Sequence, residues 1–406
     1  MGNTPNIRFK GFTNDWEQRK FGSLLEETRN KTTVEDEDTL LSCAIDGMYL
    51  NSELFSHFRG SSNIGYLKVK KNDLILSAQN LHLGNCNVNL RFEHGIISPA
   101  YKVYELVGCN PLFMQAWVKK DSTKDFFLKA STEGASVCRK NIVWEELYKQ
   151  ELPVPSIEEQ TKVGEYFNSL DHLITLHQRK CDETKKLKKF MLQKMFPKKD
   201  AKKPEIRFAG FTDDWEQRKL GDICSRVQGN DGRMELPTLT ISAANGWMKQ
   251  EDRFSGNIAG KEQTNYTLLH KGELSYNHGN SKLAKYGTVF SLQTYEEALV
   301  PRVYHSFKVE NESADFIEYY FATKIPDREL RKLISSGARM DGLLNIGYDD
   351  FMGIKMMFPS ASEQDKIAEY FRALDHIITL HRRAYYNKKG GLTNVHNDNQ
   401  QHYAIL

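Results

Sequence analysis

The chain has 406 residues, of which 39% are hydrophobic and 27% charged, so it is long enough for two or three domains with buried cores. The formal net charge of +3 excludes a strongly basic or acidic protein, and any DNA-binding surface has to be local. The six cysteines form no CxxC pair, and the N-terminus has no apolar signal core, which predicts free thiols in a cytoplasmic protein. No apolar run approaches the roughly 20 residues that span a bilayer, so no membrane contact is expected.

The first segment of the chain returns in its second half. Residues 5–22 read PNIRFKGFTNDWEQRKFG, and residues 204–221 read PEIRFAGFTDDWEQRKLG. A second pair of segments is PSIEEQTKVGEYFNSLDHLITLHQR at 155–179 and PSASEQDKIAEYFRALDHIITLHRR at 359–383. Each half thus has its own head segment and tail segment, which indicates one fold used twice. A gene duplication without functional meaning is the alternative.

Between head and tail, both halves are predicted to form short strands and a short helix. The apolar stretch 66–78 is split by the turn residues Asn72 and Asp73, and 266–276 is split by Gly272 and Glu273. Residues 111–119 and 314–323 each favour a short helix. The expected fold class is α+β, with two similar globules, each followed by a long amphipathic helix.

The two tail segments are predicted to form those helices. Ser156 with Glu159, and Ser360 with Glu363, have the spacing of a capping box, and apolar residues then recur every three or four positions. The first helix has roughly 39 residues and a length of about 58 Å. The second is expected to end before Gly390 and Gly391, because glycines and polar residues cannot extend the apolar stripe. We expect the two helices to pair as an antiparallel coiled coil.

These observations predict six segments. They are a first globule at 1–155, a long helix at 156–196, a charged linker at 197–203, a second globule at 204–358, a second, truncated long helix at 359–388 and a disordered tail at 389–406.

The sequence contains no motif that predicts catalysis. Asn110–Phe113 (NPLF) is similar to the Asn-Pro-Pro-aromatic motif of adenine-N6 methyltransferases, but Leu112 replaces the second proline, so a helix start is the better interpretation. Asp171, Glu183 and Lys185 are the residue types of a nuclease site, yet all three fall in the predicted long helix. No catalytic, cofactor-binding or metal-binding residue is predicted in this chain.

Two loops in each half are the candidates for DNA binding. They follow equivalent framework segments but differ in sequence, and they are rich in Asn, Gln, Arg and Lys, which can read base edges or bind phosphates. Ordinary solvated loops have the same composition, so this interpretation stays open at this point. The candidate residues are Gln79, Asn80, His82, Asn85, Arg91, Ser136, Arg139 and Lys140 in the first half, and Asn277, His278, Asn280, Lys282, Lys285 and Arg339 in the second.

The repeated head, the repeated tail and the two-fold layout resemble the DNA-specificity subunit of type I restriction-modification systems, over the chain up to about Arg383. The resemblance implies that the globules at 1–155 and 204–358 are target-recognition domains, each of which reads one half of a bipartite, asymmetric target in double-stranded DNA, and that the helices at 156–196 and 359–388 are the spacers between them. It also implies two methyltransferase subunits that supply S-adenosylmethionine chemistry, and restriction subunits that use ATP and Mg²⁺. The helices would then set the distance between the half-sites. A stand-alone DNA-modifying enzyme and a coiled-coil scaffold that never meets DNA are the rival hypotheses.

Overall fold

The structure is a computed structural model that describes residues 5, 7–56, 62–136, 139–199, 201–254, 260–279, 281–334 and 344–397, without the side chains of 133–136, 139, 260–262 and 387–397. The chain divides into two compact units. Unit 1 contains residues 1–178 and 382–406, and unit 2 contains residues 179–381. Both long helices are thus divided between the units. The sequence segments above instead treat each helix as a segment of its own, and those segment boundaries stay a prediction.

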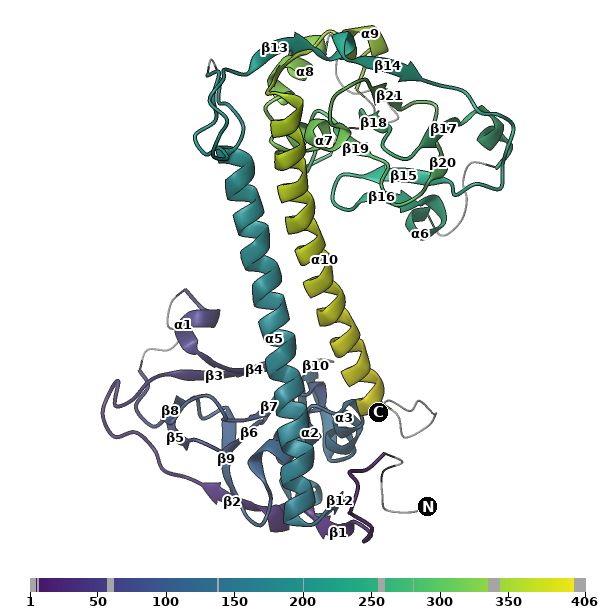
Figure 1. Cartoon of the computed structure of the whole chain (residues 1–406). Coiled ribbons are helices and arrows are strands. Elements are labelled where there is room, and N and C mark those ends of the chain that lie inside the picture. Colours follow the sequence, from purple (N-terminus) through teal and green to yellow (C-terminus); the bar gives the residue numbers. More distant parts are fainter. Residues whose placement is uncertain are drawn as a thin grey trace. The chain divides into compact units, whose positions relative to one another are not determined.

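Unit 1 is an α+β unit in which a four-stranded antiparallel sheet, in the order β2-β9-β6-β7, is flanked by two-stranded pairs and short helices (Figure 1). Its elements are β1 (Glu17–Lys20), β2 (Leu25–Thr28), β3 (Leu41–Ala44), β4 (Gly47–Leu50), α1 (Asn51–Leu54), β5 (Leu67–Lys70), β6 (Leu74–Ser77), β7 (Cys86–Val88), β8 (His94–Ile97), β9 (Tyr101–Leu106), α2 (Pro111–Val118), α3 (Asp121–Lys129), β10 (Ser131–Ser136), β11 (Arg139–Ile142), α4 (Trp144–Lys149), β12 (Glu151–Val154), the first part of α5 (Ile157–Lys194) and the end of α10 (Ala361–Asn397) from Arg382 on.

Unit 2 repeats this arrangement with the sheet order β14-β21-β18-β19. It contains the last part of α5, β13 (Glu216–Lys219), β14 (Cys224–Val227), β15 (Leu239–Ser242), β16 (Gly246–Lys249), α6 (Gln250–Phe254), β17 (Thr267–His270), β18 (Leu274–Asn277), β19 (Thr288–Ser291), β20 (Glu297–Val300), β21 (His305–Val309), α7 (Ala314–Ala322), α8 (Asp327–Leu333), α9 (Tyr348–Met352), β22 (Lys355–Phe358) and α10 (Ala361–Asn397) up to His381. The turns predicted at Asn72 and Gly272 lie between β5 and β6 and between β17 and β18, and both residues have positive φ. Left-handed backbone at these two residues makes the tight turns possible.

The head segment closes each unit by pairing with the strand just before the long helix. β1 pairs with β12, and β13 pairs with β22, both antiparallel and in the same register. In each unit the head and the start of the tail are therefore structural neighbours, although they are far apart in sequence. The doubled sequence segments form the shared framework.

A buried ion pair fastens the head to the helix start in both units. Arg8 donates from Nε and Nη2 to the two carboxylate oxygens of Glu159, at 2.6 and 2.7 Å, and Arg207 makes the same pair with Glu363, at 2.7 Å for both contacts. The two glutamates are 1% exposed. The predicted capping box is thus only half formed: the Glu159 amide donates to Ser156 Oγ at 3.4 Å, but the carboxylate is bound by Arg8. The bidentate, charge-assisted bond to arginine satisfies the carboxylate better than one backbone amide.

The neighbouring glutamine ties the same helix start to the short helix of each unit. Gln160 Oε1 accepts the amide of Asn110, whose own side chain caps α2, and Gln364 Oε1 accepts the amide of Ser313, which caps α7. The interpretation of NPLF as a helix start is confirmed. Next along α5, a Cβ on Gly164 would lie 2.6 Å from Leu112 Cβ, so only glycine allows this approach of α5 to α2.

Within unit 2, the end of α5 and the first part of α10 run side by side in opposite directions (Figure 1). Lys188 on α5 binds Asp375 on α10 at 2.6 Å, and the thiol of Cys181 reaches the backbone oxygen of Ile378 at 3.9 Å. The predicted fold class, two α+β globules with antiparallel pairing of the long helices, is confirmed. One detail differs: α10 continues through Gly390 and Gly391 to Asn397. Glycine in a helix costs only about 1 kcal/mol relative to alanine, which weakens a helix without ending it.

Candidate nucleic-acid interface

The first candidate loop of unit 1 is closed at its base by β6 and β7. The amides of Gln79 and Asn80 donate to Ser77 Oγ at 3.4 and 3.2 Å, and the Ser77 amide donates to the carbonyl of Asn85 at 3.1 Å. Ser77 is buried at the end of β6, so the central sheet fixes the loop between these residues. Gln79 is exposed, and Asn80 and Asn85 are half-buried.

His82 lies inside this loop, in the short 3₁₀ helix Leu81–Leu83, and is 9% exposed. Neither of its ring nitrogens has a hydrogen-bond partner within the part of the chain that the structure describes. Burial lowers the pKa of His82, and the charge of Lys140 lowers it further. The ring is therefore neutral at pH 7 and has one donor and one acceptor nitrogen for a ligand.

The second candidate loop of unit 1 meets the first. It is the turn of the β10–β11 hairpin, and the amide of Lys140 donates to the carbonyl of Gln79 at 3.2 Å. The side chains of Ser136 and Arg139 lie outside the described residues, but their backbones face each other at the hairpin end. Two loops that lie far apart in sequence thus form one edge of unit 1.

Unit 2 brings its two candidate loops together at the same place in the fold. Asn277 ends β18, and its side chain accepts the amide of Gly279 and donates to the carbonyl of Ile241, at 3.0 and 3.2 Å. The next residue, His278, is buried, and its carbonyl accepts the amide of Leu344 at 2.9 Å. Leu344 lies near the end of the second candidate loop of this unit, residues 335–345. Asn280 and Arg339 lie outside the described residues.

The two units present different chemistry on this shared frame. Lys282 and Lys285 are exposed in unit 2, and a hydrogen-bonded pair formed by Ser281 and Ala284 holds the turn between them. The first loop of unit 1 instead offers an imidazole and amide groups, with Lys140 beside them. Lysine suits phosphate, whereas amides suit base edges.

Several polar residues of the first loop region have structural roles. Asn87 and Asn89 are fully buried and bond to backbone carbonyls, so they belong to the core. Arg91 is half-exposed, but Glu53 binds it at 2.7 and 2.9 Å. It lines a cavity of about 290 Å³ with Asp46 and other residues, apart from the loop pair. The structure does not bring Arg91 together with the other candidates.

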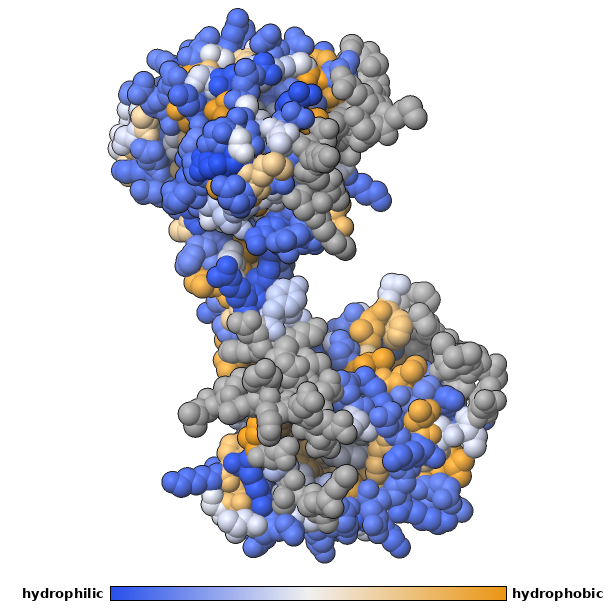
Figure 2. Space-filling view, turned by 90° about the vertical axis from the view of Figure 1, so that its right-hand side faces the viewer, coloured by the Kyte–Doolittle hydropathy of each residue, from blue (hydrophilic) through white to orange (hydrophobic). Residues whose placement is uncertain are grey.

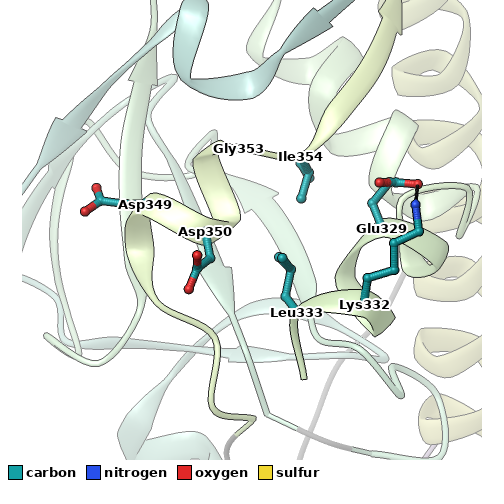
Figure 3. A pocket seen from close by; sticks show the side chains of 7 residues that line it. All are labelled: Glu329, Lys332, Leu333, Asp349, Asp350, Gly353 and Ile354. Carbon is teal, nitrogen blue, oxygen red and sulfur yellow. Dashed lines mark hydrogen bonds and ion pairs between the residues drawn. The ribbon is translucent and has the colours of Figure 1, made fainter. Parts of the chain in front are cut away.

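A second cavity, of about 250 Å³, lies between α8 and α9 of unit 2 (Figure 3). Figure 3 shows Asp349 and Asp350 on one side and Glu329 on the other, where Glu329 forms an ion pair with Lys332 at 2.6 Å. Carboxylates therefore outnumber the cation, and this arrangement repels phosphate.

Neither metal binding nor membrane spanning finds support among the described residues. No group of three or more His, Cys, Asp or Glu side chains there could hold a metal ion. In the same part of the chain, no helix combines the length and apolar character needed to cross a bilayer. The five cysteines within it are free.

Apolar side chains also recur on the outside of the two long helices. Leu173 on α5 and Ile377 on α10 occupy equivalent places in the tail segments and are 37% and 39% exposed. The face drawn in Figure 2 is mainly hydrophilic, with small separate hydrophobic patches (Figure 2). Trp215 is 2% exposed and Trp16 half-buried, which agrees with a role as core anchors.

The chain is similar to proteins of one functional class. Residues 212–387 match the family described as type I restriction modification DNA specificity domain. The type I restriction enzyme MjaVIII specificity subunit of Methanocaldococcus jannaschii is 25% identical over 235 residues, which cover 53% of this chain and 50% of that protein. The putative MjaX specificity subunit of the same organism is 24% identical over 244 residues, 51% of this chain and 52% of that protein. The chain thus spans about half the length of the curated relatives it matches.

A solved structure extends the likeness of fold to nearly the whole chain. The S subunit of a type I restriction-modification system from M. genitalium covers 97% of this chain and 98% of its own, with 12% identity and a TM-score of 0.59. At this identity the likeness concerns the fold alone. The matches agree with the resemblance found in the sequence: residues 212–387 match the DNA specificity domain of type I restriction-modification systems, and the chain is similar to specificity subunits of such systems.

Proposed function

We propose that this chain reads a bipartite, asymmetric DNA target, with one half-site for each unit. The observation that carries the proposal is the meeting of two candidate loops at the same edge of both units, through Lys140 and Gln79 in unit 1 and through Leu344 and His278 in unit 2. A shared frame with unlike loops fits unlike half-sites.

The chemistry of the loops supports different roles within each half-site. Gln79, Asn80 and Asn85 carry amides that can pair with the edge of adenine through two hydrogen bonds, and the neutral ring of His82 adds a donor and an acceptor. Lys282 and Lys285 of unit 2 fit phosphates, which position the protein without reading sequence.

We further propose that two methyltransferase subunits dock on the repeated framework. The Arg8–Glu159 and Arg207–Glu363 pairs give both units the same junction of head and helix, and Leu173 and Ile377 repeat as half-exposed apolar residues further along the same helices. Equal partners need equal surfaces, because an interface depends on matching shape and apolar contact. These partners would supply S-adenosylmethionine chemistry, and restriction subunits would use ATP and Mg²⁺.

In this proposal the chain itself is non-catalytic and works in the cytoplasm, where its DNA and partners are. The repeated framework binds the methyltransferase subunits, and the loops bind the DNA target. Methylation or cleavage of DNA by the purified chain alone would establish the rival hypothesis of a stand-alone enzyme.

A binding experiment tests the DNA part of the proposal. We expect the chain with its methyltransferase partner to shift duplex DNA in a gel, and Lys282→Glu to weaken binding and make the salt dependence less steep by about one unit of slope. Lys271→Glu is the matched control: this lysine is half-exposed, pairs with Glu296 and lies at the opposite end of β18.

If both substitutions weaken binding equally, the loop is not the DNA surface. Absence of any shift with the partner present would favour the scaffold hypothesis.

A further inference from the structure

A third loop borders the candidate DNA-binding loops in each unit. It is the connection from β8 to β9 in unit 1, residues 98–100, and the connection from β20 to β21 in unit 2, residues 301–304. In unit 1 the amide of Ala78, which directly precedes Gln79, donates to the carbonyl of Ala100 at 3.0 Å. The third loop of unit 1 therefore lies beside the start of the first candidate loop.

A repeated tyrosine anchors this third loop in both units. Tyr101 begins β9, and its hydroxyl donates to the carbonyl of Cys43 on β3 at 2.9 Å. Tyr304 directly precedes β21, and its hydroxyl lies 3.0 Å from Thr240 Oγ1 and accepts the amide of Ile241 at 3.3 Å. Thr240 and Ile241 belong to β15, the equivalent of β3. In both units the tyrosine thus fastens the loop to the same strand of the neighbouring hairpin.

In unit 2 this strand also holds the first candidate loop. The carbonyl of Ile241 accepts the side-chain amide of Asn277 at 3.2 Å, while the amide of Ile241 binds Tyr304. Asn277 ends β18 and opens the first candidate loop of this unit. Ile241 therefore fixes both loops at one place, and Arg302 lies two residues before the anchored tyrosine.

Arg302 is exposed, and its guanidinium is not used by the protein. No hydrogen bond or ion pair engages it within the part of the chain that the structure describes. Two other arginines of the unit are engaged: Arg226 lies over the ring of Tyr348 at 4.4 Å, and Arg253 donates to the carbonyl of Ile241 at 2.7 Å. The N–H donors of Arg302 are therefore available to a ligand.

The polar side chains of the first candidate loop differ from this arginine in what they can bind. The side chain of Asn277 is used at both ends, since its oxygen accepts the amide of Gly279 at 3.0 Å and its nitrogen donates to Ile241. Lys282 and Lys285 carry compact ammonium groups, which suit phosphates. A guanidinium instead has a fixed fork of parallel N–H groups that matches O6 and N7 of guanine in the major groove.

We propose that Arg302 reads a guanine in the half-site of unit 2, on a third DNA-binding loop. Two parallel N–H groups of the side chain donate to O6 and N7 of the base. Unit 1 has Pro99 at the equivalent place, two residues before Tyr101, and a proline side chain has no donor for such a contact. The inference rests on the proposed reading of a bipartite DNA target and adds one base contact to it.

Base-resolution mapping of adenine methylation tests the inference in cells that carry the full chain and its methyltransferase partner. We expect Arg302→Ala to relax one guanine position in one half of the target, while the other half and the gap stay unchanged. Arg302→Lys keeps the charge but lacks the fork, so it should relax the same position. Lys271→Ala is the matched control and should leave every base unchanged, because Lys271 pairs with Glu296 just before β20, at the other end of that strand from Arg302.

A binding measurement with the same complex gives a second readout. Replacing the relaxed guanine by 7-deazaguanine removes the N7 acceptor and should weaken binding of the duplex to the unsubstituted complex about tenfold. The complex with Arg302→Ala should bind the two duplexes equally, since it makes no contact with N7.

Two kinds of result would overturn the inference and leave the proposed function intact. In the first, Arg302→Ala changes no base of a bipartite target, or neither half of the target contains a guanine. In the second, Arg302→Lys restores the original target, or Arg302→Ala lowers methylation of all sites equally, because Arg302 then binds a phosphate. An unsubstituted chain without a bipartite target would instead contradict the proposed function, and the inference with it.

Discussion

Replacing Phe196 by alanine tests the packing of unit 2 at its most enclosed point. The ring is 1% exposed and contacts four aromatic rings, so Phe196→Ala removes a full side chain from a site that cannot collapse easily. Losses of this kind cost about 3–5 kcal/mol in free energy of unfolding. For a unit of this size, each kcal/mol lowers the melting temperature by roughly 2–4 °C, so a decrease of roughly 6–20 °C is expected.

The assay is urea and thermal unfolding followed by tryptophan emission and by calorimetry. The matched control is Phe190→Ala on the same helix: Phe190 is 48% exposed, and its loss should change the free energy of unfolding by no more than about 0.5 kcal/mol. Proteolysis should show earlier cleavage in unit 2 only. If the two variants lose equal stability, the end of α5 does not close the core of unit 2.

Three further predictions concern the packing of α5 on α2, the buried carboxyl group of Asp73 and the length of α5. Gly164→Ala should lower the free energy of unfolding by about 1–3 kcal/mol despite the better helix propensity of alanine, because its Cβ would lie 2.6 Å from Leu112 Cβ; a urea titration that shows stabilisation would refute the close approach of α5 and α2. Burial raises the pKa of Asp73 to about 6. The folded chain therefore keeps a proton that the unfolded chain releases near pH 4, so the free energy of unfolding should fall as the pH rises from about 4 to about 6. Asp73→Asn retains an oxygen for the Lys70 amide and should remove this fall, with a gain of about 1–2 kcal/mol at pH 7; unchanged pH profiles of unfolding would contradict it. Inserting four residues after Thr184 lengthens α5 by about 6 Å and should widen the gap between the half-sites by about 2 base pairs without changing either, as methylation mapping can determine; altered bases at an unchanged gap would refute the helix as a spacer.

The doubled segments made most of the framework predictable. Apolar residues at helical spacing predicted α5 and α10, and the turn residues Asn72 and Gly272 predicted the strand breaks, because these features depend on local sequence. The role of Glu159 was mistaken for a capping contact. A signal was present, since Arg8 and Glu159 both recur in the second half, and residues that repeat together often touch.

Burial of the polar loop residues could not be predicted in the same way. Asn87 and Asn89 have the composition of a surface loop, yet neighbouring strands cover them and their amides bond to backbone carbonyls. Arg91 is bound by Glu53, which lies far away in sequence. Such contacts depend on which strands become neighbours, and one sequence does not contain this information locally.

Base-resolution mapping of adenine methylation, in cells that carry this chain with its methyltransferase partner, tests the central claim most directly. We predict methylated adenines in a target of two short half-sites with an unread gap, of which substitutions at Gln79 or Asn80 alter one half and substitutions at Lys282 or Lys285 weaken methylation of the target as a whole. A single continuous target, or a target whose bases remain unchanged when the unit 1 loop is replaced, would contradict the account.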